Sequence, residues 1–156
     1  MPDEDAPNPG IAPGTVFAFF NEIGIIQQLS RAMFEARLPD GIIVQHFSVL
    51  NHLIRVADGR TPLELSRAFQ VPKASLTNTL AGLEKRGLVE MRPHPKDGRS
   101  KQVWLTEEGR AFRDHAISLL VPDILALSDK LDLEELMRLT PRLTEIRKIL
   151  DENRNT

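Results

Sequence analysis

The chain has 156 residues, of which 41% are hydrophobic and 27% charged, a composition typical of one soluble globular domain with its own core. The absence of cysteine excludes disulfides, cysteine-ligated metal centres and thiol-based catalysis or oxidant sensing. No apolar run approaches the roughly 20 residues of a membrane span, and the acidic start Met1-Pro2-Asp3-Glu4-Asp5 differs from a secretion signal. We therefore expect a cytoplasmic protein with no membrane partner.

Charge is distributed unevenly along the chain. Residues 1–54 carry 2 basic and 6 acidic side chains, residues 55–113 carry 12 and 7, and residues 114–156 carry 6 and 9. The net charge of −2 therefore hides a basic middle segment. We expect that segment to meet a polyanion and the flanks to serve another purpose, such as self-association. Because the excesses are small, a chance distribution is the alternative.

The N-terminal third predicts a disordered arm followed by two helices. Residues 1–14 contain four prolines and two glycines and are predicted to be disordered. From about residue 15, apolar residues recur at spacings of three and four, which predicts a helix that Leu38-Pro39-Asp40-Gly41 breaks. A second helix is expected over residues 43–56.

The next stretch predicts a helix-turn-helix. Thr61-Pro62-Leu63-Glu64 is a capping box with proline at the first helical position, and it opens a short helix that ends near Phe69. Gln70-Val71-Pro72 predicts a tight turn. A further helix is expected over residues 73–86, with Gly87 as its C-terminal cap.

A β-hairpin wing is expected after Gly87. Residues 88–92 and 102–105 have the pattern of strands, and the basic segment 93–100 joins them. The predicted fold is therefore mainly α with a small β-hairpin wing (α+β), in which residues 42–106 form a winged helix-turn-helix.

Helices are again expected after the hairpin. Thr106-Glu107-Glu108-Gly109 opens a long helix, in which Pro122 predicts a kink or a break. A last helix begins at Asp132, with Glu135 completing a second capping box. We assign residues 15–38 and 107–156 to a helical dimerisation region.

The second helix of the helix-turn-helix carries small polar side chains of the kind that a DNA major groove accepts. We take Lys73, Ser75, Thr77 and Asn78 as candidate readers. Asparagine can bond an adenine edge with two hydrogen bonds, whereas serine and threonine can contact bases or phosphates. Lys73 adds positive charge at a helix N-terminus, which already attracts phosphate. The alternative is an ordinary solvated helix face, which the adjoining turn and wing disfavour.

Three segments resemble the signature of the MarR family of bacterial transcription regulators. They are Leu83-Glu84-Lys85-Arg86-Gly87-Leu88-Val89, Asp97-Gly98-Arg99-Ser100-Lys101 and Val103-Trp104-Leu105-Thr106-Glu107-Glu108-Gly109. The resemblance covers nearly the whole chain. It implies an obligate homodimer whose terminal helices intertwine, whose recognition helices enter successive major grooves and whose wings reach neighbouring minor grooves. Repression is an expectation at the level of the family.

The same resemblance assigns roles to the wing. It implies that Asp97 holds the hairpin and that Arg99 approaches DNA, where a guanidinium suits the narrow, electronegative minor groove. Arg92, Lys96 and Lys101 would add phosphate contacts, although each alone is more often a solvated surface charge. Trp104 is expected to be a core residue rather than a stacking platform.

Apolar faces at both ends of the chain are candidates for dimerisation. The residues concerned are Phe17, Phe20 and Ile23 near the start, and Leu136, Leu139, Leu143, Ile146 and Leu150 near the end. An intramolecular helical core is the alternative, which the resemblance disfavours.

The resemblance also allows release from DNA by a small, often aromatic or phenolic, effector. Phe17, Phe20, His46 and Phe47 are the candidates for lining its cleft. Aromatic residues at helical spacing are more often core, and we prefer that interpretation. We expect no cofactor and no metal, because the four histidines lack metal-ligand spacing.

The chain contains none of the common phosphate-binding, hydrolase or metalloprotease motifs, so we predict that it is not an enzyme. The sequence therefore predicts a homodimeric transcriptional repressor that binds double-stranded DNA at a pseudo-palindromic operator, with half-sites about 34 to 36 Å apart. A winged-helix module for protein interaction or RNA binding is the alternative.

Overall fold

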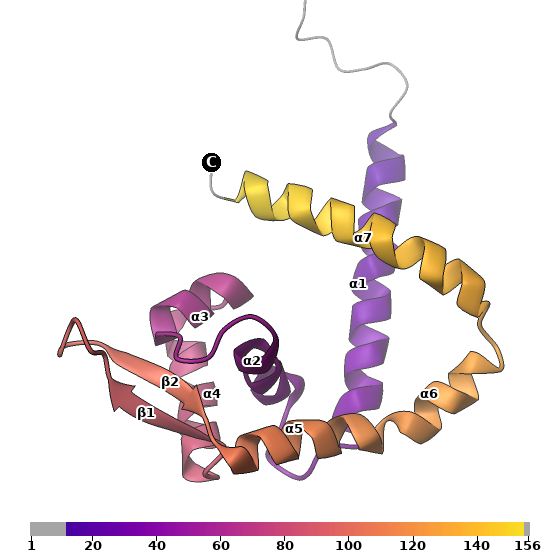
Figure 1. Cartoon of the computed structure of the whole chain (residues 1–156). Coiled ribbons are helices and arrows are strands. Elements are labelled where there is room, and N and C mark those ends of the chain that lie inside the picture. The colour runs from indigo at the N-terminus through magenta and orange to yellow at the C-terminus, as the bar shows by residue number, and fades with distance from the viewer. Residues whose placement is uncertain (1–11, 155–156) are drawn as a thin grey trace, which may run out of the picture. The chain divides into compact units, whose positions relative to one another are not determined.

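The computed structural model describes residues 12–154, and the chain divides into two compact units, Met1–Ala116 and Ile117–Thr156. Helices dominate, and the two strands form one antiparallel hairpin, which confirms the predicted fold class (Figure 1). The elements in chain order are α1 (Pro13–Glu35), α2 (Val44–Arg55), α3 (Pro62–Phe69), α4 (Lys73–Lys85), β1 (Val89–Pro93), β2 (Lys101–Leu105), α5 (Glu107–Leu119), α6 (Val121–Ser128) and α7 (Leu133–Asn153).

Helix α1 begins at Pro13, two residues inside the arm predicted for residues 1–14, because proline is well tolerated in the first turn of a helix. The rest of that arm, residues 1–11, lies outside the described residues. At the other end of α1, the Glu35 carboxylate accepts hydrogen bonds from Arg31 Nε and from the Val44 backbone N–H, each at 3.0 Å. These bonds, the one from Val44 above all, lower the pKa of Glu35 and join the end of α1 to the start of α2.

The predicted helix-turn-helix is present in α3 and α4. The Thr61 hydroxyl accepts the Glu64 N–H at 3.2 Å, and the Glu64 carboxylate accepts the Thr61 N–H at 2.7 Å, so the predicted capping box forms in full. Gln70 ends α3 in the left-handed conformation, with φ 52°. Pro72 then precedes the first residue of α4.

The hairpin is fastened to the segment in front of α3. Its register pairs Val89 with Leu105 and Pro93 with Lys101. The Val103 N–H donates to the Arg60 carbonyl at 2.8 Å, so that Arg60 forms an isolated antiparallel β-bridge with β2. The Asp58 carboxylate accepts the Leu105 N–H at 2.9 Å. The base of the wing is therefore fixed from outside the hairpin, whereas its tip is not.

Two apolar clusters hold the first unit together. The larger one gathers buried leucines and valines of α2, α3, α4 and the hairpin: Val49, Leu50, Leu53, Leu65, Leu76, Leu80, Leu83, Leu88, Val89 and Val103. A second cluster contains Leu38, Ile42 and Ala116, with Phe34, Phe47 and Phe112 packed against it. Because α4 contributes a full buried stripe to the larger cluster, its opposite face is left outward.

The second unit consists of α6, α7 and the last residues of α5. The long helix predicted from residue 107 breaks at Leu120, two residues before Pro122, since proline is better placed in the first turn of a new helix. The Asp132 carboxylate accepts the Glu135 N–H at 3.1 Å and caps α7. The Glu135 side chain pairs with Arg138 at 2.7 Å, so the second predicted capping box forms in one direction. Neither α6 nor α7 buries a residue among those described.

Gly109, where α5 passes Leu88, offers a test of this packing. A Cβ placed there would overlap the Leu88 carbonyl oxygen and lie 3.0 Å from Leu105 Cδ1. We expect Gly109→Ala to lower the free energy of unfolding by about 2 to 3 kcal/mol, because backbone atoms must move to admit the methyl group. Urea denaturation would measure the change.

Gly98→Ala is the matched control, because nothing lies within 4 Å of its added methyl group. We expect it to leave the free energy of unfolding within about 0.5 kcal/mol of the original protein. Equal stability of the two variants would contradict the close contact at Gly109.

Candidate nucleic-acid interface

Helix α4 presents one buried and one exposed face. Leu76, Thr79, Leu80 and Leu83 point into the core. The four candidate readers are all exposed, and they lie on α4 as the periodicity predicted: Lys73, Ser75, Thr77 and Asn78. Ala74 and Ala81 are exposed beside them and leave room for close approach of a partner.

The polar side chains of this face differ in what they can still bond. The Thr77 hydroxyl donates to the Lys73 carbonyl at 2.9 Å, so its proton is used within the helix and its lone pairs and methyl group face outward. Asn78 makes no side-chain hydrogen bond within residues 12–154, which leaves both its amide N–H groups and its carbonyl oxygen for a ligand. Asn78 therefore has the chemistry that bidentate base recognition needs.

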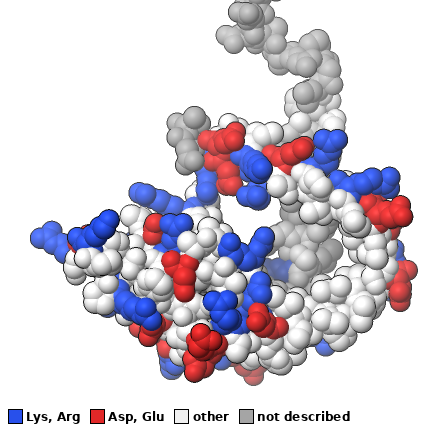
Figure 2. Space-filling view, viewed as in Figure 1, with Lys and Arg blue, Asp and Glu red and all other residues white. Residues whose placement is uncertain are grey.

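The tip of the hairpin is held by its own short bonds. The Asp97 carboxylate accepts the Arg99 N–H, and the Asp97 carbonyl accepts the Ser100 N–H, both at 3.0 Å. The Ser100 carbonyl in turn accepts the His94 N–H at 3.0 Å. Lys96, Asp97 and Arg99 are exposed, and Figure 2 shows basic side chains gathered at the end of the wing. Asp97 thus holds the loop from which Arg99 projects.

Arg92 lies on β1, but its guanidinium is already engaged. Its Nε donates to the Glu90 carboxylate at 2.6 Å, its Nη2 pairs with the same carboxylate, and its Cζ lies 4.9 Å from the centre of the Trp104 ring. Trp104 is half-buried, packed on one side against Gly59. The expectation of a core tryptophan is therefore only partly met, because the indole also supports a surface arginine.

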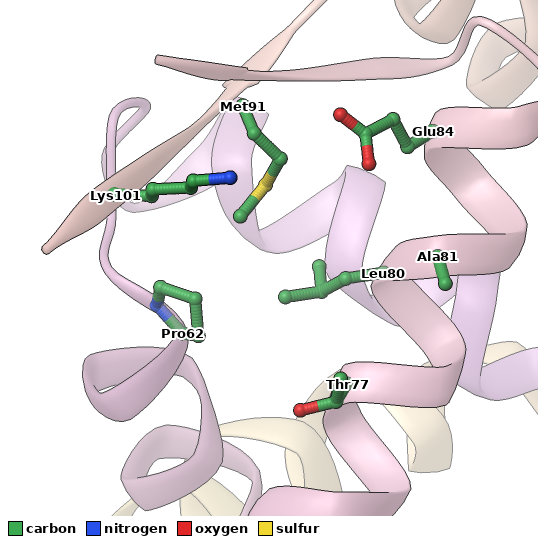
Figure 3. A pocket seen from close by; sticks show the side chains of 7 residues that line it. All are labelled: Pro62, Thr77, Leu80, Ala81, Glu84, Met91 and Lys101. Carbon is green, nitrogen blue, oxygen red and sulfur yellow. The ribbon is translucent and has the colours of Figure 1, made fainter. Parts of the chain in front are cut away.

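An open hollow with a cavity volume of about 170 Å³ lies between α4, the hairpin and the start of α3 (Figure 3). Thr77 and Lys101, predicted separately as helix and wing residues, both line it. Its remaining lining residues are Pro62, Leu80, Ala81, Glu84 and Met91. Glu84 and Met91 were not predicted from the sequence as surface features, although the spacing of Thr77, Ala81 and Glu84 along α4 indicates that they share one side of the helix.

The four candidates for an effector cleft do not come together within one chain. Phe47 packs edge-on against Phe34, with ring centres 4.6 Å apart, near the C-terminal end of α1. Phe17 and Phe20 lie in the first third of α1, and a helix rise of 1.5 Å per residue puts Phe20 about 20 Å from Phe34. Phe47 is therefore a core residue, as the preferred interpretation held, and Phe17 is exposed.

His46 is occupied within the chain as well. Its Nδ1 accepts the Ile43 N–H at 3.1 Å at the start of α2. Burial, reinforced by the charge of Arg86, lowers the pKa of His46 below its ordinary value. Near pH 7 the imidazole is therefore neutral and keeps the lone pair that caps α2.

Within residues 12–154, no three histidine, aspartate or glutamate side chains lie close enough together to hold a metal ion. None of the helices in this part of the chain combines the length and apolar character that crossing a membrane requires.

The candidate dimerisation residues lie at the surface of the single chain. On α1, Phe17 and Phe20 are exposed and Ile23 is half-buried. On α7, Leu136, Leu139, Leu143 and Leu150 are exposed and Ile146 is half-buried. Helix α6 adds exposed apolar residues that were not predicted as dimerisation residues: Val121, Ile124, Leu125 and Leu127. So many exposed large apolar side chains are typical of surfaces that a partner covers.

Residues 40–100 match the MarR family. The chain is 30% identical to wild-type MarR from E. coli in its apo form, with 89% of this chain and 98% of that one covered and a TM-score of 0.69. The chain belongs to the MarR family. Members of this family are transcriptional regulators rather than enzymes, in agreement with the prediction from sequence.

Two further relatives of this MarR-family chain bear on its function. The HTH-type transcriptional repressor YetL of Bacillus subtilis is 31% identical over 102 residues, which span 65% of this chain and 61% of YetL, less than two thirds of its length. A mutant of E. coli MarR complexed with operator DNA is 29% identical, with 85% of this chain and 95% of that one covered and a TM-score of 0.69.

The two wing arginines of this MarR-family protein are expected to contribute unequally to DNA binding. Arg99 projects from a loop that Asp97 holds, whereas Arg92 must leave Glu90 and Trp104 before it can reach a phosphate. We expect Arg92→Gln to weaken duplex binding by less than threefold and Arg99→Gln by tenfold or more. Fluorescence anisotropy with a labelled duplex measures both.

Tryptophan emission supplies an independent check on the same pair. Arg92→Gln should change the emission of Trp104, the only tryptophan, whereas Arg99→Gln should not. A larger loss of affinity from Arg92→Gln than from Arg99→Gln would contradict this ranking.

Proposed function

We propose that this protein is a homodimeric, sequence-specific DNA-binding repressor of transcription that acts in the cytoplasm of a bacterium. The observation that carries the proposal is the exposed face of α4, with an uncommitted Asn78, beside a hairpin whose tip presents Arg99. The E. coli relative complexed with operator DNA and the YetL repressor support it. The geometry of α4 and the wing supports the choice of contact residues, and the relatives support DNA as the partner.

In this proposal α4 enters the major groove and the hairpin reaches the adjacent minor groove. Asn78 reads an adenine edge, Ser75 and Thr77 contact bases or phosphates, and Lys73 binds a phosphate beside the helix N-terminus. One sugar–phosphate strand separates the two grooves, so it must pass between α4 and the wing. We place this strand along the hollow lined by Thr77 and Lys101, where the Lys101 ammonium can bind a phosphate on the side away from the Glu84 carboxylate.

Dimerisation places two such surfaces on one operator. The apolar side chains of α1, α6 and α7 that stay exposed in one chain support it, because monomers seldom expose so large an apolar surface. A two-fold dimer reads a pseudo-palindrome, with half-sites about 34 to 36 Å apart.

The proposed function also includes release of the protein from DNA by a small aromatic or phenolic effector. Within one chain Phe17 and Phe20 lie about 20 Å along α1 from Phe34, on which Phe47 packs. An effector cleft that uses all of these aromatic residues therefore needs both copies of the chain.

Substitutions of Asn78 and Arg99 test the proposed DNA contacts. Arg99→Ala should weaken binding to every duplex, because a minor-groove arginine contributes largely through charge and groove shape. Asn78→Ala should cost about 1 to 3 kcal/mol and relax the preference at one base position in each half-site. Anisotropy titrations at two salt concentrations, with duplex from upstream of the gene and with a scrambled duplex, measure both effects.

Arg55→Ala serves as the control, since this exposed cation of α2 lies outside α4, the wing and the proposed dimerisation region and should leave affinity nearly unchanged. A winged helix that serves protein interaction or RNA binding would leave duplex affinity unaltered in both test variants. That result would overturn the assignment of these residues.

The proposed dimer is tested on α7. Leu143 lies in the stripe of candidate dimerisation residues, whereas the still more exposed Met137 points to the opposite side of the helix. A lysine buried at position 143 would lack a partner, so we expect Leu143→Lys to raise the dimer dissociation constant roughly 100-fold. Met137→Lys should leave it within threefold. Sedimentation velocity over a concentration series would distinguish them, and a monomeric original protein or equal effects would refute the proposed interface.

A further inference from the structure

Arg86, which follows the last residue of α4, contacts a part of the chain far from it in sequence. Its Nη2 donates to the Asp40 carbonyl at 2.6 Å, although 46 positions separate the two residues. Asp40 belongs to the linker, residues 36–43, which joins α1 to α2. The hydrogen bond therefore connects the C-terminal end of α4 to the segment that leads out of α1.

Two glycines make this approach possible. A Cβ on Gly41, whose φ is +80°, would lie 2.7 Å from Arg86 Nη2. A Cβ on Gly82, within α4, would lie 2.9 Å from His46 Nε2. Side chains larger than hydrogen would push the guanidinium and the imidazole away at these two points. We call these five residues, Asp40, Gly41, His46, Gly82 and Arg86, the Arg86 junction.

The imidazole of His46 takes part on both sides of the junction. Its Nδ1 caps α2 by accepting the Ile43 N–H, while its Nε2 edge lies against Gly82 of α4. The start of α2 and the last turns of α4 are therefore packed through one ring. A change in the position of Arg86 or of the linker alters the surroundings of that ring.

The neighbouring basic residue is arranged differently. Lys85 is exposed and makes no side-chain hydrogen bond or ion pair with the described part of the chain. On α4 it lies on the same face as Ala74, Asn78 and Ala81, whereas Arg86 lies on the flank of Gly82, toward α2. The two adjacent cations therefore differ: Arg86 bonds to the linker, whereas Lys85 remains available to a phosphate of bound DNA.

We propose that Arg86 is a positioning residue for DNA recognition: it fixes the C-terminal end of α4 against the linker and thereby sets the angle at which α4 meets the groove. It does not bind phosphate. The inference rests on the proposed function, because an angle of α4 matters only where α4 reads a partner. Loss of the bond lets the end of α4 move, so that Asn78 and its neighbours lose register while the number of phosphate contacts stays the same.

The salt dependence of binding separates positioning from phosphate contact. Each phosphate contact contributes about −0.9 to the slope of log K against log salt concentration. We expect Arg86→Gln to weaken duplex binding at least tenfold while leaving that slope unchanged. Lys85→Gln, which removes the same formal charge from the groove face, should make the slope shallower by about one. A slope made shallower by about one in Arg86→Gln would overturn the proposal.

Arg86→Lys gives a second discrimination with the charge retained. A lysine cannot reproduce the planar guanidinium between Gly41 and Asp40, so positioning predicts an affinity between those of the original protein and Arg86→Gln. A phosphate contact predicts affinity close to that of the original protein, since an ammonium also serves a phosphate. This variant also keeps the test available where Arg86→Gln folds poorly.

The titration of His46, followed by NMR without DNA, tests the junction itself. Removal of the nearby guanidinium charge should raise the pKa of His46 in Arg86→Gln, and Lys85→Gln should leave it unchanged. An unshifted His46 in Arg86→Gln would overturn the junction. Failure of the original protein to bind any duplex, with the His46 shift present, would instead overturn the proposed function, and with it the role of Arg86 in recognition.

Discussion

The candidate interface depends on the junction at Thr106, where α4, the hairpin and α5 meet. The Thr106 hydroxyl donates to the Gly87 carbonyl at 2.6 Å and accepts the Gly109 N–H at 2.9 Å. The Thr106 N–H donates to the Leu88 carbonyl at 3.3 Å, beside which Gly109 leaves room for the backbone. One residue thus caps α5, closes the base of the hairpin and fixes the segment that follows α4. The spacing between α4 and the wing follows from these bonds, and the proposed access to two neighbouring grooves depends on that spacing.

Several basic side chains of this protein form bonds with other parts of the same chain. Arg113 of α5 donates to the Asn51 side chain of α2 at 2.8 and 3.1 Å, and Arg86 donates to the Asp40 carbonyl. Arg60 pairs with Glu64 at the start of α3, at 3.0 Å. The basic excess of residues 55–113 is therefore an imperfect measure of the charge that a polyanion would meet. Lys73, Lys85, Lys96 and Arg99 make no side-chain hydrogen bond or ion pair within residues 12–154, and all four lie on α4 or at the wing tip.

Local patterns account for what could be predicted from the sequence. The capping box at Thr61, the turn before Pro72 and the strand alternation around Met91 each involve neighbours in the chain, so propensity and periodicity are sufficient to locate them. The exposure of the four candidate readers on α4 follows from the same periodicity. Their contacts with DNA remain a prediction.

Features that depend on distant residues could not be predicted in this way. The partners of Arg86 and Arg92 are set by the packing of α4 and of the hairpin. The sequence alone does not distinguish either arginine from one that binds a phosphate. The four candidates for an effector cleft are all aromatic, but they lie in two separate places, because Phe17 and Phe20 are far along α1 from the end on which Phe47 packs. Apolar spacing defines a helix face without specifying what covers it.

The sequence likewise does not specify what covers the candidate dimerisation residues. The winged part and the C-terminal helices differ in how much apolar surface they bury within one chain. The winged part buries a stripe from each of α2, α3 and α4, and its larger apolar cluster is complete within one chain. Helices α6 and α7 bury no residue among those described, although they carry leucines at regular intervals. In the proposed dimer such a segment would gain much of its stability from association, so its folding and its oligomeric state would be coupled. For this protein we therefore expect DNA recognition and self-association to be separable by substitution, with the Arg86 junction acting where α1 leads into the winged part.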